Sequence, residues 1–274
     1  MPRSSPITMT FPPFEGAVRK LVLANLAAFF AVALLLWLAP DATGNALGHL
    51  LLQPLRVAHG EIWQLVTYSF VELGLLAILF NMLTLWFCGS ILEGAYGSRW
   101  LNELYFSSVI GGALLATILS FSGVLHLSPQ DVAGGAVAGI FGVLIAIAMR
   151  FGDLEFLLFF LVRIRAKYLV AIYILIALAV LLKDANAFGA LLELSGVLCG
   201  YLYVRFAPRR GLAFGVSEQY FGLRNAYYRS KRRRAARKFE VYMGKQGRQV
   251  HFDKEGRYVD PDERKDPNDK RWMN

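Results

Sequence analysis

The stretch from residue 133 to residue 150 is apolar up to its terminal arginine, and small residues recur along it at helical spacing. Gly135, Gly139, Gly142 and Ala146 follow one another at intervals of four, three and four, which places them on one face of a helix. Small residues on one face let a second backbone approach closely, and helices in lipid pack in this way. The stretch therefore predicts the central helix of a membrane-embedded bundle.

Composition supports the same class of protein. The chain has 274 residues, of which 56% are hydrophobic, which is too apolar for an ordinary soluble domain. Its two cysteines, Cys88 and Cys199, lie inside apolar runs, so they form neither a disulfide framework nor a metal-ligand pattern. We predict an all-α membrane protein that needs no cofactor and no metal.

Six apolar runs have a length suited to membrane spans, and we place them at about Leu21–Leu38, Leu75–Leu92, Leu101–Leu125, 133–150, Tyr168–Leu182 and Phe188–Phe206. A cleaved signal peptide is the rival interpretation of the first run, but Pro40-Asp41 is a poor cleavage site and the chain spans again. The predicted organisation is an N-terminal cytoplasmic segment (1–18), a six-helix membrane domain (19–206) and a tail (207–274).

Two loops are expected to lie in the membrane interface. The first, residues 41–73, is rich in apolar residues, and its Trp63 and Tyr68 suit the headgroup region. The second follows the central span and combines an aromatic apolar patch with three cations, Arg163, Arg165 and Lys167.

The tail accounts for the whole net positive charge of the chain. Residues 207–274 contain 18 Lys and Arg against 9 Asp and Glu, and the entire sequence has a net charge of +9. By the positive-inside rule this tail is cytoplasmic, and six spans then make the N-terminus cytoplasmic too. We expect a bacterial inner membrane.

A basic run occupies residues 229–238 of the tail. Beside a span, such a run contacts anionic lipid headgroups, and we expect this of Lys231, Arg232, Arg233 and Arg234. Ribosome or nucleic-acid binding is not expected, because a basic run alone is a weak signal; interleaved aromatics suit an amphipathic interfacial helix. Beyond it, Glu240–Met243 and Arg248–Phe252 alternate like short strands, and residues 260–274 are predicted to be disordered.

Five ordered motifs resemble the rhomboid intramembrane serine proteases. They are Gly60-Glu61-x-Trp63-x-Leu65-x-Thr67-x-x-Phe70, Leu79-Phe80-Asn81-Met82 with Trp86, Gly89 and Leu92-Glu93, Tyr96-Gly-Ser-Arg99, Gly135-Ala-Val-Ala-Gly-Ile-Phe-Gly142 and Glu193-Leu-Ser-Gly-x-x-x-Gly200. The resemblance covers about residues 20–206 and implies a six-helix rhomboid-like bundle. Helical spacing separately places Gly196 and Gly200 on one face with Glu193.

The resemblance also implies where the catalytic groups would lie. The family's nucleophilic serine falls on Val137 and its general-base histidine on Glu193. Its two oxyanion-stabilising residues fall on Ala77 and Asn81, of which Asn81 is retained. Valine has no hydroxyl and cannot form an acyl-enzyme, so no catalytic set is intact. Gln64 stands where some relatives carry arginine.

Two alternatives concern the remaining polar groups. Ser195 is two residues from Glu193 and on a different side of the helix, which argues against a nucleophile–base pair. Glu193 is a functional-site candidate as an ionisable group in a span. It could also be a protonated acid bonded to a neighbour such as Asn81.

The function that the resemblance implies is that of a pseudoprotease, which binds transmembrane segments of client proteins without cutting them. Asn81, Glu193 and Trp63 are the client-binding candidates. The alternatives are an intramembrane serine endopeptidase with an unconventional site and a transporter around Glu193; no repeat of broken spans supports the transporter.

Overall fold

The computed structural model describes residues 12–123, 127–158, 162–183, 187–207, 212–245, 250–252 and 258–259. The chain divides into two units, Met1–Gly211 and Leu212–Asn274. Predictions that concern residues 1–11 and residues 260–274 lie outside the described residues.

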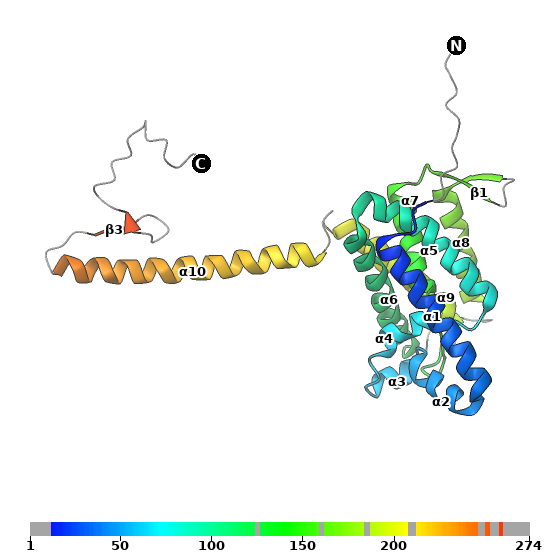
Figure 1. The fold of residues 1–274 in the computed structure, drawn as a ribbon. Helices are drawn as coiled ribbons and strands as arrows, with labels where there is room; N and C mark the ends of the chain where they lie inside the picture. Colours follow the sequence, from blue (N-terminus) through cyan, green and yellow to red (C-terminus); the bar gives the residue numbers. More distant parts are fainter. Residues whose placement is uncertain are drawn as a thin grey trace, which may run out of the picture. The chain divides into compact units, whose positions relative to one another are not determined.

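The first unit is a bundle of apolar helices (Figure 1). They are α1 (Gly16–Leu38), α5 (Leu75–Tyr96), α6 (Ser98–Ser120), α7 (Val137–Arg150), α8 (Ala166–Leu182) and α9 (Ala187–Phe206). Within the described residues, α1, α5, α6 and α9 are long and apolar enough to cross a membrane, whereas α7 and α8 are shorter apolar helices. The prediction of an all-α polytopic membrane domain is confirmed at this level.

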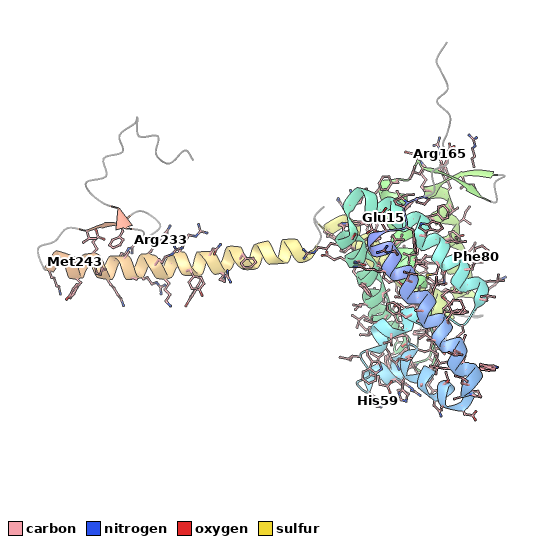
Figure 2. All side chains as sticks on the ribbon, viewed as in Figure 1. Glu15, His59, Phe80, Arg165, Arg233 and Met243 are labelled. Atoms are coloured by element: carbon pink, nitrogen blue, oxygen red, sulfur yellow. The ribbon has the colours of Figure 1, made fainter. Side chains whose placement is uncertain are left out.

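The two connecting segments expected at the interface lie at opposite ends of this bundle (Figure 1). The first loop folds into the short helices α2 (Pro40–Leu50), α3 (Pro54–Ala58) and α4 (Gln64–Thr67), followed by the 3₁₀-helix η1 (Tyr68–Phe70). The segment after α7 is an antiparallel hairpin of β1 (Glu155–Leu158) and β2 (Val162–Arg165), which places Glu155 opposite Arg165. Figure 2 marks the two ends with His59 and Arg165.

Helices α6, α7 and α9 touch through their backbones. A Cβ on Gly200 would lie 2.6 Å from Cα of Gly142, and a Cβ on Gly196 would lie 2.5 Å from the carbonyl oxygen of Ala138. A Cβ on Gly139 would collide with the ring of Tyr105. These glycines therefore lie where the sequence analysis expected close helix packing.

The central helix is shorter than predicted. α7 begins at Val137, so Gly135 is not part of its packing face, and that prediction is wrong. Gly135 has φ +104° and donates its N–H to the carbonyl of Tyr68 at 2.9 Å. Ala133 forms an isolated β-bridge with Leu52. The first loop thus hydrogen-bonds to the segment before α7 at Ala133 and Gly135, and irregular backbone of this kind is tolerated in a membrane protein where protein surrounds it.

At the end of the bundle opposite the first loop, one acidic side chain fixes the start of α1. Glu93 on α5 accepts hydrogen bonds from the backbone N–H groups of Ala17 at 2.6 Å and Val18 at 3.0 Å. The first N–H groups of a helix have no partner within the helix, and a carboxylate satisfies them well. Ser98 also donates to Glu93.

The second unit contains α10 (Leu212–Lys245), a helix of 34 residues, and the strands β3 (His251–Phe252) and β4 (Tyr258–Val259). Glu240–Met243 lies in this helix, so its prediction as a strand is wrong. Lys231, Arg232, Arg233 and Arg234 are consecutive in the helix and therefore point around most of its circumference. α10 consequently has no separate apolar face, which argues against an amphipathic interfacial helix.

Candidate functional site

The positions that match the family's catalytic residues come from three helices. Val137 is the first residue of α7, and Glu193 lies in the second turn of α9. Both side chains are partly buried. Ala77 and Asn81 are one turn apart on α5, with Ala77 exposed and Asn81 partly buried.

Asn81 is bonded to an acid other than the one expected. Its Nδ2 donates to Oε2 of Glu72 at 3.0 Å. The bond between Asn81 and Glu193, which the sequence analysis gave as one alternative, is absent, and among the described residues Glu193 makes no hydrogen bond or ion pair. The sequence analysis therefore singled out Asn81 but did not consider Glu72 as its partner.

Glu72 is the residue that the sequence analysis missed. It lies between η1 and α5, outside the spans, and its carboxylate faces the turn that leads into α7. Burial raises the pKa of Glu72 above its ordinary value of 4.5, and interactions with Asn81 and the backbone amide of Ala136 oppose part of that rise. The sequence did contain a signal for Glu72. This acid stands directly between the first-loop motif and an apolar span, and an acid in such a position requires a polar partner.

Within the described residues, no serine or threonine hydroxyl is paired with a base inside the bundle, and the buried hydroxyl that does bond to a carboxylate there is that of Tyr203 on α9, which donates to Glu103 of α6 at 3.0 Å. Ser195 is buried on α9 and makes no hydrogen bond to Glu193 or to another described side chain. Ser98 donates to Glu93, but this exposed pair belongs to the cap of α1. A serine nucleophile needs a base within hydrogen-bond reach, and neither residue meets that requirement.

The first-loop motif forms a hydrogen-bonded unit around a buried amide. The Gln64 side chain is fully buried; its Nε2 donates to Oε2 of Glu61 at 2.8 Å and its Oε1 accepts from the backbone N–H of Gln53 at 2.9 Å. Half-exposed Trp63 donates from Nε1 to the carbonyl of His49 at 2.9 Å. The loop is therefore rigidly folded, and it presents part of the Trp63 ring at its surface.

Metal chemistry has no support in the described part of the chain. Three or more His, Cys, Asp or Glu side chains nowhere gather there in a group that would hold an ion. Cys88 and Cys199 are both free thiols. The polar side chains near α7 can form hydrogen bonds and carry charge.

These features define a polytopic helical membrane protein that has a rhomboid-like arrangement of motifs. Comparison with known families agrees with the class. A family model described as "Eukaryotic integral membrane protein (DUF1751)" matches residues 22–219, and the chain belongs to this family.

Similarity to curated rhomboid proteins is distant. The chain is 31% identical over 93 residues to "Rhomboid protease GluP" of Bacillus subtilis (strain 168), a match covering 34% of this chain and 17% of that protein. It is 33% identical over 86 residues to "RHOMBOID-like protein 1" of Arabidopsis thaliana, covering 31% and 21%. It is 28% identical over 220 residues to "Rhomboid-like protein 19" of Arabidopsis thaliana, covering 76% and 66%.

The lengths of these matches limit what they show. The match spans about a fifth of the length of each of the first two relatives and two thirds of the third. They identify a rhomboid-like integral membrane protein. The family is described as eukaryotic, so the expectation of a bacterial inner membrane has no support from it.

Proposed function

We propose that this protein is a rhomboid-like membrane protein without proteolytic activity that binds transmembrane segments of client proteins. The observation that supports this most directly is Val137 at the start of α7, where the family resemblance places the nucleophile. The partly buried Glu193 has no hydroxyl partner among the described residues, so no substitute pair replaces the missing one.

The lipid-facing side of α5 provides surface for a client helix. Leu76, Leu79 and Phe80 are each at least half exposed, and Phe80 projects outward from α5 in Figure 2. An apolar groove of about 420 Å³ between α1 and α5 adjoins this surface and includes Phe29, Leu79 and Trp86. Asn81, on the same helix, adds an amide that could bond to an exposed backbone carbonyl of a client segment.

A cleavage assay tests the inactive state. The purified full-length protein, reconstituted with a fluorogenic transmembrane substrate, is expected to release no more product than a heat-killed sample. An active rhomboid protease under the same conditions provides the positive control. Release that a serine-directed reagent inhibits would establish the alternative, an intramembrane endopeptidase with an unconventional site.

Site-specific crosslinking tests client binding. Photoreactive residues at positions 77, 137 and 193 are expected to trap segments of other membrane proteins. Leu175, which is 62% exposed on α8, is the matched control position for random lipid-facing contact. Adducts only between the protein's own helices, or equal trapping at position 175, would contradict the proposal.

The same proposal includes topology and lipid contact. Both termini are placed in the cytoplasm, and the basic run on α10 contacts anionic headgroups through Lys231, Arg232, Arg233 and Arg234. The β1–β2 hairpin carries Arg163 and Arg165, which supports a cytoplasmic location for that end of the first unit.

A further inference from the structure

The apolar groove between α1 and α5 runs along the outside of the helix bundle. Its floor includes the buried side chains of Val22, Ile78 and Met82, whereas Phe30 and Leu79 on its rim are exposed. Every residue that lines the groove is hydrophobic. Because both helices are long and apolar enough to cross a membrane, the groove opens toward lipid. The part of any ligand that lies in it is therefore hydrocarbon.

The groove has the length of one membrane leaflet but is narrower than a helix. It follows α1 from Val22 to Phe30 for about 12 Å, and it follows α5 from Leu75 to Trp86 for about 16 Å. Half of the hydrocarbon core of a bilayer is about 15 Å thick. Over that length a volume of about 420 Å³ gives a cross-section of about 30 Å², whereas a helix with its side chains occupies about 80 Å². The groove therefore admits an acyl chain and excludes a transmembrane helix.

A cation stands one turn beyond the groove, toward the end of the bundle opposite the first loop. A Cβ on Gly89 would lie 2.9 Å from Val18, so this turn of α1 lies at the level of Gly89. Arg19, Val22 and Leu26 follow one another at intervals of three and four and share one face of α1. The Arg19 side chain is exposed and makes no hydrogen bond or ion pair within the described residues. A headgroup bound to Arg19 would place its acyl chain at the open end of the groove.

The other charged residues at this end leave Arg19 available to an anion. Lys20 is also exposed, but it lies about 100° further round α1 and points away from Val22. Glu93 is bonded to the first amides of α1. Glu15 precedes Arg19 by one turn, and no ion pair joins the two in the described structure.

We propose that the groove between α1 and α5 binds an anionic phospholipid, whose acyl chain lies along the groove and whose phosphate contacts Arg19. A guanidinium group pairs well with phosphate oxygens, and the apolar walls bind the chain without polar groups. The inference goes beyond client binding and does not depend on it, because the groove is too narrow for a client helix.

Brominated phospholipids test the site through Trp86, which lines the groove. The full-length protein is placed in phosphatidylcholine nanodiscs, in which a rising fraction of the lipid is replaced by phosphatidylglycerol with brominated acyl chains. Quenching of Trp86 is the fluorescence difference between the wild type and Trp86→Phe. Since one cation favours an anionic lipid by about fivefold, half-quenching is expected at a mole fraction about fivefold lower than with brominated phosphatidylcholine.

Two neighbouring cations supply the matched comparison. Arg19→Gln removes the proposed phosphate contact and is expected to abolish the preference for phosphatidylglycerol. Lys20→Gln removes the same charge from another side of α1 and is expected to retain it. Equal quenching by the two lipids in the wild type, or an equal loss in both variants, would overturn the site. Protection of Trp86 from both lipids would assign the groove to a protein segment and would also overturn it.

Native mass spectrometry keeps the proposal testable if Trp86→Phe does not fold, because it requires no change in the groove. After purification with phosphatidylglycerol present, the wild type and Lys20→Gln are expected to retain one more molecule of this lipid than Arg19→Gln. Equal retention by all three proteins would contradict a phosphate contact at Arg19.

Discussion

At the scale of single residues, the site depends on two substitutions and one added acid. Under the proposed function, Val137 and Glu193 stand where the resemblance places a serine and a histidine, and Glu72 supplies a carboxylate to Asn81. The Asn81 amide is thus engaged by the chain's own Glu72, whereas a working serine protease needs its donors free for a developing oxyanion.

Glu72 is expected to make stability depend on pH. Because its pKa is raised in the folded protein, the folded state binds the proton more tightly than the unfolded chain. The free energy of unfolding therefore falls as the pH rises above 4.5 through the folded pKa. Glu72→Gln does not titrate, so wild type should lose stability relative to this variant over that range.

Thermal unfolding of both proteins across mildly acidic to neutral pH measures this effect. Glu155→Gln controls for the general loss of one negative charge. Parallel curves for wild type and Glu72→Gln would show that Glu72 does not titrate differently on folding.

At the scale of elements, glycine contacts decide how α6, α7 and α9 pack. Gly196 and Gly200 of α9 lie against the backbone of α7 at Ala138 and Gly142. Since apolar burial gives no advantage over lipid, this close van der Waals contact is a major source of helix association. α10 differs, because its consecutive cations Lys231 to Arg234 point around most of the helix and leave no separate apolar face there.

Gly196→Ala is expected to destabilise the bundle by about 1 to 3 kcal/mol, because the new Cβ would lie 2.5 Å from the Ala138 carbonyl oxygen. Gly94→Ala on α5 is the matched control, since no atom lies within 4 Å of the added Cβ. Denaturant or thermal unfolding in detergent measures both. Equal stability of the two variants would contradict the backbone contact.

Replacement of Lys231, Arg232, Arg233 and Arg234 by alanine is expected to abolish lipid-dependent protection of α10. Each base contributes about 1 kcal/mol near an anionic surface, and salt screens the attraction. Hydrogen exchange of the full-length protein in anionic and neutral nanodiscs measures it. Protection of wild-type α10 that is the same in both lipids would argue against headgroup binding.

At the scale of the whole molecule, the membrane unit has two different ends. The first-loop helices lie at one end and the β1–β2 hairpin at the other, as Figure 1 shows. This separation fits an odd number of crossings between the two segments, and basic residues of the hairpin favour the cytoplasmic side for that end.

Cysteine accessibility tests this sidedness. In sealed vesicles of known orientation, His59→Cys and Asp153→Cys are expected to react with an impermeant maleimide from opposite faces. Lys245→Cys on α10 should react from the same face as position 153. Reaction of positions 59 and 153 from one face would refute the proposed topology.

Much of the architecture follows from the sequence by itself. Hydropathy marks the apolar helices, because a spanning segment has to satisfy its own backbone and present apolar side chains to lipid. The absence of a hydroxyl at Val137 is likewise a property of the residue and needs no coordinates. Helical spacing also identified Gly139, Gly142, Gly196 and Gly200 as packing positions.

Only the tertiary structure decided where α7 begins and which acid Asn81 binds. The turn before α7 is set by bonds from Ala133 and Gly135 to residues of the first loop more than 60 positions earlier, and periodicity within one helix cannot report such partners. Asn81 could bond to any acid that the fold brings near it, and the fold brings Glu72. Pairings between distant segments depend on how the helices pack, so they are fixed by the assembled bundle.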